Sequence, residues 1–386
     1  MGAVFRKIGQ TAVIGEMFAG ILLGPSLLGR AFPSIEARLF PPASLTTLHL
    51  ISQLGVVLFM FAVGLSVDVD RLRRRARATI IISNAGIVVP FALGLLVSLY
   101  LYRDYAPAGV PLTTFALFMG IAMSVTAFPV LARIIAERGL NGTELGDTAL
   151  GCAAIDDVTA WCLLALVLAV SRGAGFQEPF VAVMLAVLVA VIVLKGVRPR
   201  AARIFGEPDT PVAGPRLLVP VMLFLFAAAL STEAIGVHAL FGAFIAGVAV
   251  AGSEPLREPL RLAVEPLTTA VLLPLFFAFA GLRTEVGLLS VQAWLACAVI
   301  ISAAVAGKFG GVTAAARLVG LRWTESLALG VLMNTRGLME LIVLNIGYDL
   351  GILSPTMYTM MVIMALATTC MAGPALALLG RKRKFA

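Results

Sequence analysis

Residues 145–171 read L-G-D-T-A-L-G-C-A-A-I-D-D-V-T-A-W-C-L-L-A-L-V-L-A-V-S, an apolar run with two adjacent acids near its middle, Asp156 and Asp157. At 1.5 Å of rise per residue, this run forms a helix about 40 Å long, which is enough to cross a bilayer. A charge at the centre of a bilayer costs at least ~2.5–3.5 kcal/mol. The stretch therefore predicts a membrane-spanning helix that carries a buried acidic site.

The composition of the whole chain agrees with a membrane location. Of its 386 residues, 60% are apolar and 13% are charged, whereas soluble domains carry about a quarter charged residues. In a membrane protein, the net charge of +8 indicates how the basic residues are distributed between the two sides of the membrane. We therefore expect no nucleic-acid partner. The apolar runs are continuous, not alternating, which excludes a β-barrel.

Apolar runs of spanning length recur along the sequence and predict an all-α polytopic membrane protein with about twelve transmembrane helices. The predicted segments, numbered 1 to 12 in chain order, are 11–29, 48–66, 78–101, 112–136, 145–171, 178–197, 216–232, 236–252, 263–282, 288–316, 323–347 and 354–379.

The basic residues predict the orientation of these segments. With the C-terminus in the cytoplasm, the connections that hold most of the 29 Lys and Arg residues fall on the cytoplasmic side. Cytoplasmic loops are enriched in Lys and Arg. We therefore expect a multi-pass protein of the inner cell membrane with a cytoplasmic C-terminus.

Three pairs of segments resemble one another in the same order along the chain. The clearest pair is L-F-M-F-A-V-G-L-S-V-D at Leu58–Asp68 and L-F-F-A-F-A-G-L-R-T-E at Leu275–Glu285. The partners are seven segments apart, an odd number, so they run in opposite directions across the membrane. This arrangement predicts an inverted-topology repeat, which is typical of secondary transporters.

The two adjacent acids suggest ion chemistry. Successive helical residues point about 100° apart, so one of Asp156 and Asp157 can face a cation path while the other meets a partner. Burial and mutual repulsion favour the protonated form of a carboxylate, so that protons can compete with a metal cation for one site. That competition is the minimal chemistry of an exchanger. The alternative is a purely structural buried pair.

Lys308, within Gly307-Lys308-Phe309-Gly310-Gly311, lies well inside a predicted span, whereas Lys195 lies at the end of one. We expect its ammonium to pair with Asp156, and the flanking glycines to let another backbone come close. The alternative is a side chain that extends to the membrane surface.

Segments 4 and 11, which the repeat relates, both contain a predicted helix break. Pro129 follows Ser124–Phe128 in segment 4 and removes a helical hydrogen bond, and Asn334–Gly337 interrupt segment 11. Two such breaks expose helix ends and free carbonyls to a buried site. Arg336 and Glu340, four residues apart, are expected to form a supporting structural pair.

The sequence therefore favours a cation/proton exchanger. A sodium-coupled symporter of an organic solute is the alternative, and an ion channel is a third possibility. The sequence contains no H-E-x-x-H, G-x-S-x-G or G-x-x-x-x-G-K-[ST] motif, so we expect neither an enzyme nor a resident cofactor.

In combination, the acid pair, Lys308 and the broken segments resemble the monovalent cation:proton antiporter-2 family. The stretches Phe128–Ile135 and Leu332–Gly347 are similar to its plant-exchanger branch and bacterial relatives. The resemblance implies an inverted-repeat fold with two crossed discontinuous helices, elevator-like alternating access and a homodimer.

The resemblance also implies a division of residues 1–386, a single exchanger domain, into parts. The core would comprise 78–171 and 288–379, the dimer scaffold 1–66 and 216–283, and a linker helix 178–197. Family members usually have thirteen helices, and the first of them is not expected here. The plant branch often carries Asn where this chain has Asp156.

The resemblance further implies roles for single residues. Asp157 would bind the transported sodium or potassium ion and the proton in turn. Asp156 would pair with Lys308. The residues that would line the helix crossing are Ser124, Thr126, Asn334 and Thr335.

Overall fold

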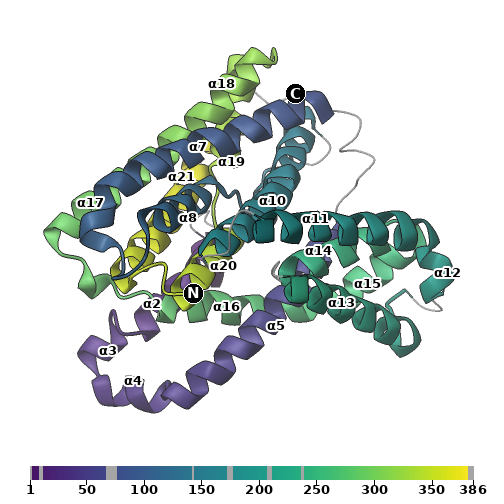
Figure 1. The fold of residues 1–386 in the computed structure, drawn as a ribbon, viewed down its shortest axis with the longest axis horizontal. Helices are drawn as coiled ribbons and strands as arrows, with labels where there is room; N and C mark the ends of the chain where they lie inside the picture. The colour runs from purple at the N-terminus through teal and green to yellow at the C-terminus, as the bar shows by residue number, and fades with distance from the viewer. Residues whose placement is uncertain are drawn as a thin grey trace. The chain divides into compact units, whose positions relative to one another are not determined.

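The computed structural model describes residues 2–7, 12–66, 76–140, 143–171, 177–206, 211–235 and 239–380, and all secondary structure in these ranges is helical (Figure 1). The chain forms two compact units. The first comprises Met1–Leu39, Arg71–Ala160 and Ala280–Ala386, and the second comprises Phe40–Asp70 and Trp161–Phe279. Helices α10 (Glu144–Ser171) and α16 (Leu273–Leu282) contribute residues to both units.

The first unit contains both interrupted segments and the acidic pair. Besides parts of α10 and α16, its elements are α1 (Gly2–Lys7), α2 (Ala12–Leu23), α3 (Leu28–Ala31), α4 (Pro33–Leu39), α7 (Ala76–Tyr105), α8 (Leu112–Ser124), α9 (Phe128–Glu137), η4 (Val286–Leu288), α17 (Val291–Val305), η5 (Ala306–Gly310), α18 (Gly311–Leu318), α19 (Trp323–Met333), α20 (Leu338–Asp349) and α21 (Pro355–Gly380).

The second unit contains the remaining helices. They are α5 (Pro42–Ser66), α11 (Gln177–Ile192), η1 (Val193–Val197), η2 (Arg198–Arg200), α12 (Ala201–Phe205), α13 (Pro215–Ile235), α14 (Ala239–Val250), α15 (Glu254–Leu267) and η3 (Thr268–Leu272).

Helical structure occurs in each of the twelve predicted segments. Within the described residues, six helices are long and apolar enough to cross a membrane, and α8 and α14 are shorter apolar helices. The six are Ser44–Ser66, Arg77–Tyr105, Pro215–Ile235, Glu254–Leu282, Val291–Leu318 and Pro355–Leu379. The chain is thus an all-helical multi-pass membrane protein, while the count of twelve spans stays a prediction.

Both predicted helix breaks are present. Helix α8 ends at Ser124, Val125 is extended (φ −68°, ψ 136°), and α9 begins at Phe128. Helix α19 ends at Met333, and α20 begins only at Leu338. Pro129 is suited to the first turn of α9, where it occupies the second position. Gly337 precedes α20, and a Cβ at this position would lie 2.8 Å from Cγ2 of Val130 in α9.

Glycines let helices approach closely at positions that the repeat relates. A Cβ on Gly64 of α5 would lie 2.3 Å from the carbonyl oxygen of Phe244 in α14, within the second unit. A Cβ on Gly281 of α16 would lie 2.4 Å from the carbonyl oxygen of Met17 in α2, within the first unit. Gly64 and Gly281 occupy the same place in the matched motifs, which supports the predicted repeat.

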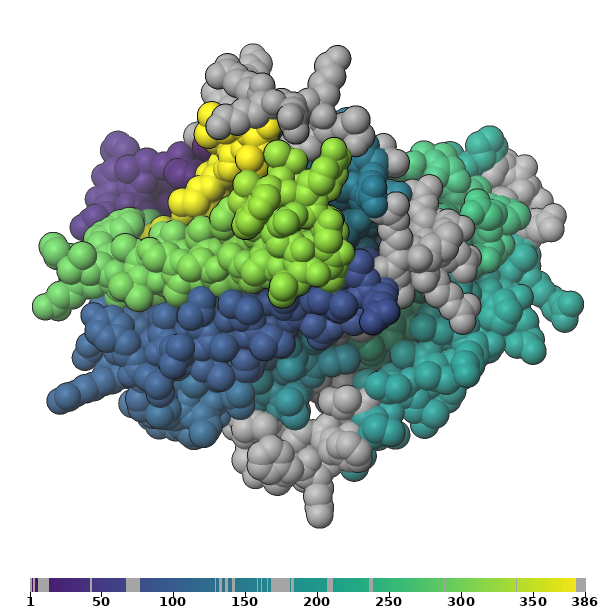
Figure 2. Space-filling model, turned by 90° about the horizontal axis from the view of Figure 1, so that it is seen from above, coloured from purple at the N-terminus to yellow at the C-terminus, as the bar shows by residue number. Residues whose placement is uncertain are grey.

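Helix α7 packs along α17 and α18 in the first unit, where Figure 2 shows it in blue beside the light-green pair. Gly307 makes this contact possible, because a Cβ there would lie 2.8 Å from Cα of Pro90. The neighbouring Lys308 lies in the π-helical turn η5, and such turns are frequent at functional sites. The close packing brings its side chain to the interior of the unit, where it is 0% exposed.

Candidate functional site

Asp156 is the centre of a buried hydrogen-bond cluster in the first unit. Its Oδ1 accepts a bond from Ser83 Oγ at 2.5 Å, and its Oδ2 accepts bonds from Thr126 Oγ1 at 2.8 Å and Lys308 Nζ at 2.7 Å. All four residues are 0% exposed. Both oxygens of Asp156 thus have donors, one of them a cation, which is what a buried acidic group requires.

Lys308 uses all three of its ammonium protons. It donates to Asp156 and to the backbone oxygens of Gly86 at 2.7 Å and Ser124 at 2.5 Å. The carbonyl of Gly86 is available because Pro90, four residues later in α7, has no N–H to donate to it. The carbonyl of Ser124 is available because α8 ends there. Lys308 is therefore fixed by three acceptors and is buried with its charge compensated.

Asp157 has the opposite environment. It is 1% exposed, and neither of its carboxylate oxygens has a hydrogen-bond partner among the residues that the structure describes. A bare carboxylate in such a place is costly unless it gains a positive partner. The two adjacent acids thus differ: Asp156 accepts several hydrogen bonds, and Asp157 accepts none from the described residues.

The C-terminal end of α8 is held by two cations. Arg336, which is 0% exposed, donates from Nη1 to the oxygen of Ala122 at 3.0 Å and from Nη2 to that of Met123 at 2.6 Å. Lys308 takes the next carbonyl, that of Ser124. The last carbonyls of a helix carry the negative end of its dipole, so both positive charges stabilise this buried helix end.

The two breaks also contact each other directly. Thr126 Oγ1 lies 3.1 Å from the oxygen of Met333, and Ala127 N donates to the oxygen of Thr335 at 3.2 Å. The Thr335 hydroxyl itself donates to Leu332 O within its own segment. Neutral groups thus cap the end of α19, in contrast to the cationic groups at α8.

Three other predicted residues also lie at the breaks. The hydroxyl of Ser124 donates to Gly120 O in its own helix, so that its carbonyl, not its side chain, faces Lys308. Asn334 is 6% exposed, and its Oδ1 has no partner in the described part of the chain. Arg336 Nη1 lies 3.4 Å from Glu340 Oε2, within ion-pair distance, although Arg336 precedes α20.

Two members of the cluster were missed by the sequence analysis. Ser83 carried no signal, because serines are common in apolar helices, where they bond to their own backbone. Gly86 contributes only its backbone carbonyl. Pro90, four residues later, could have predicted this, because proline has no N–H to bond to the carbonyl of Gly86. In the described ranges, no three His, Cys, Asp or Glu side chains gather as ligands for a metal ion.

A helical membrane protein whose two interrupted helices meet beside a buried acidic pair has the architecture of a secondary transporter. The model of the family "Sodium/hydrogen exchanger, transmembrane" matches residues 1–382. The chain belongs to this family, which is one of transporters and not of enzymes.

Several curated proteins with similar sequences are named as antiporters. The Na(+)/H(+) antiporter NhaS4 of Synechocystis sp. is 41% identical over 380 residues, which are 97% of this chain and 92% of the relative. Cation/H(+) antiporter 18 of Arabidopsis thaliana is 39% identical over 96% of this chain and 46% of its own length. K(+)/H(+) antiporter 1 of Saccharomyces cerevisiae is 33% identical over 96% of this chain and 43% of its own. The chain thus spans less than half the length of the plant and yeast relatives.

A solved structure has a similar fold. The sodium proton antiporter MjNhaP1 from Methanocaldococcus jannaschii superimposes with a TM-score of 0.63 over 99% of this chain and 95% of that one. The two sequences are 16% identical, so the likeness concerns the fold alone.

Proposed function

We propose that this chain exchanges a monovalent cation, sodium or potassium, for protons across a cell membrane, and that Asp157 carries the two in turn. The observation that carries the proposal is the contrast between the acids: Asp156 has three donors, and Asp157 has none among the described residues. A carboxylate without fixed donors is free to exchange one positive partner for another.

In this proposal Asp156 and Lys308 do not carry the ion. Their 2.7 Å ion pair holds α10 against η5 and keeps a fixed positive charge beside the binding acid. The residues proposed to line the cation path around the breaks are Ser124, Thr126, Asn334 and Thr335.

The names of the relatives support exchange over the symport alternative. They describe sodium/proton, cation/proton and potassium/proton antiporters, so both ions are proposed as substrates. A cation held by carboxylate and carbonyl oxygens suits either ion, since hard cations prefer oxygen ligands. Comparing the two ions in the same vesicles establishes which is preferred.

The transport cycle is proposed to be elevator-like alternating access within a homodimer. The moving core would be 78–171 and 288–379, the dimer scaffold 1–66 and 216–283, and the linker helix 178–197. The protein is proposed to lie in the inner membrane with a cytoplasmic C-terminus, although residues 381–386, whose basic side chains support this orientation, lie outside the described residues.

Replacing Asp157 with Asn tests the proposal. The change preserves shape and removes the titrating charge, so we expect exchange in proteoliposomes, followed with an internal pH dye, to fall to the level of empty vesicles. Asp104→Asn, at an exposed acid near the end of α7, is the matched control and retains activity. Sodium-driven or potassium-driven proton movement by folded Asp157→Asn protein would exclude Asp157 as the carrier.

A further inference from the structure

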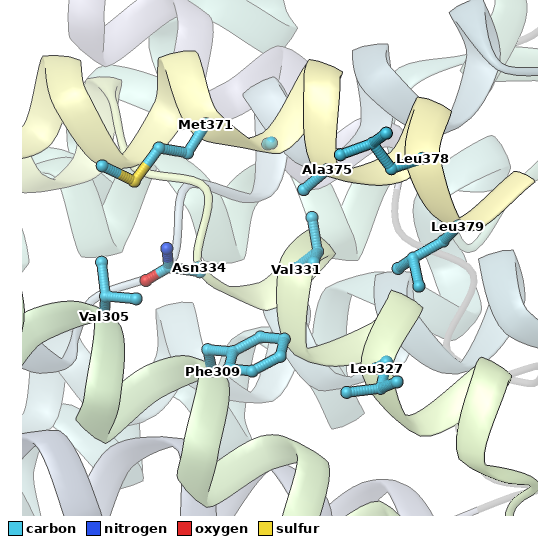
Figure 3. Close-up of a pocket in the computed structure, with 10 residues that line it drawn as sticks. Val305, Phe309, Leu327, Val331, Asn334, Met371, Ala375, Leu378 and Leu379 are labelled. Carbon is cyan, nitrogen blue, oxygen red and sulfur yellow. The ribbon is translucent and has the colours of Figure 1, made fainter.

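A cavity of about 380 Å³ lies between α17, η5, α19 and α21 of the first unit. Its walls are apolar except at one place, the side chain of Asn334. Figure 3 shows Asn334 beside Val305 and Met371 at one end, and Leu327, Leu378 and Leu379 at the other. Cavities of this size hold small organic ligands.

The cavity is elongated along two helices. From Met371 to Leu379, α21 advances about 12 Å, and from Leu327 to Asn334, α19 and the start of its break advance about 10 Å. The side chains of Phe309 and Val331 line its middle (Figure 3). This shape fits a single alkyl chain better than a compact or branched molecule.

Asn334 determines which polar group the ligand must carry. Its side chain is 6% exposed, and its Oδ1 has no hydrogen-bond partner among the described residues. A buried acceptor without a donor is unfavourable, because it has lost its hydrogen bonds to water. A hydroxyl satisfies a carboxamide well, because it can both donate and accept. A charged ammonium is disfavoured, since none of the described residues that line the walls is a carboxylate and burial of a lone charge is costly.

We propose that this cavity binds an uncharged amphiphile, a straight alkyl chain with a terminal hydroxyl, whose hydroxyl bonds to Asn334 and whose chain lies along Met371–Leu379. The site does not include the acidic pair, but it shares Asn334 with the residues proposed to line the cation path. It reaches the break after α19, because Asn334 is the residue that follows Met333, whose carbonyl meets Thr126. An occupant therefore packs directly against the interrupted segment.

Photolabelling of the full chain in lipid nanodiscs tests the site. The probes are decanol with a diazirine in its chain, the methyl ether of the same compound, and the corresponding decylammonium. We expect the alcohol to label peptides that contain Leu327–Asn334 and Met371–Leu379 about tenfold more than the ether, which cannot donate a hydrogen bond. Equal labelling by alcohol and ether overturns the proposal, and so does stronger labelling by the ammonium compound.

A pair of variants locates the labelling. Ala375→Phe fills the cavity, and we expect it to remove most of the labelling by the alcohol. Ala377→Phe, at an exposed alanine of the same helix that does not line the cavity, leaves labelling unchanged. Labelling that survives in Ala375→Phe overturns the site. If that variant does not fold, the ratio of alcohol to ether in the native chain decides alone.

Discussion

At the scale of single residues, the site depends on how Lys308 is satisfied. Its three protons go to one carboxylate and two backbone carbonyls. Those carbonyls are free for separate reasons, a proline in α7 and the end of α8. The charge of Lys308 is therefore compensated partly by backbone dipoles, and three segments of the first unit meet at one ammonium group.

Removal of Lys308 is expected to destabilise the protein strongly. Lys308→Ala leaves Asp156 as a buried charge without its partner, which costs about 3–5 kcal/mol. We expect a clearly lower melting temperature for the purified protein, and partial recovery in the double variant Lys308→Ala/Asp156→Asn, which removes both charges. Lys195→Ala, at an exposed lysine, is the control. An unchanged melting temperature in Lys308→Ala would contradict a structural ion pair.

The sequence predicted part of this cluster. The pairing of Asp156 with Lys308 was predicted because two opposite charges inside apolar runs need each other. The sequence did not predict that Asp157 rather than Asp156 would lack donors; only the family resemblance suggested it. Helical periodicity separates neighbouring side chains by direction but does not say what lies in each direction.

At the scale of elements, each interrupted helix ends in a different chemical environment. The end of α8 is held by Lys308 and Arg336, whereas the end of α19 is held by the hydroxyl of Thr335, and the break that follows it by the amide of Ala127. The sequence repeat does not predict this difference, because it relates the two interrupted segments to each other and not the side chains that bind their ends. The breaks themselves were predictable, since proline and glycine interrupt helices by local geometry.

Close helix approach at the matched glycines leads to a test. Gly64→Ala and Gly281→Ala each place a Cβ within 2.4 Å of a backbone oxygen that belongs to another helix. We expect each change to cost about 1–3 kcal/mol, as overpacking does, and to lower the melting temperature. Gly196→Ala has nothing within 4 Å of its new Cβ and is expected to be neutral or slightly stabilising. Neutral behaviour of all three would show that the helices separate without cost.

At the scale of the whole molecule, the helical membrane fold followed from composition and segment length. The grouping into two units did not, because apolar runs carry no information on which of them pack together. Residues up to Leu39 belong to the unit that contains the acidic pair, whereas the predicted scaffold included 1–66. The division into a moving core and a dimer scaffold remains a prediction about which parts of the chain move during transport.

The proposed activity has a defined dependence on pH. If protons and cations compete for Asp157, the cation concentration for half-maximal exchange rises as pH falls, while the maximal rate is unchanged. With one proton displaced per cation, the rise approaches about tenfold per pH unit where the carboxyl is mostly protonated. Initial rates in proteoliposomes at several pH values measure it. A constant half-maximal concentration with a changing maximal rate would argue against competition.

The distance in sequence between Asp156 and Lys308, 152 residues, has a consequence for biogenesis. The ribosome adds about 5–20 residues per second, so roughly 8 to 30 seconds pass between the addition of Asp156 and the addition of its lysine. During that interval the α10 segment enters the insertion machinery with two uncompensated acids. Ribosome-bound chains that stop before Lys308 should therefore hold this helix at the membrane surface, and chains that continue beyond it should integrate the helix fully.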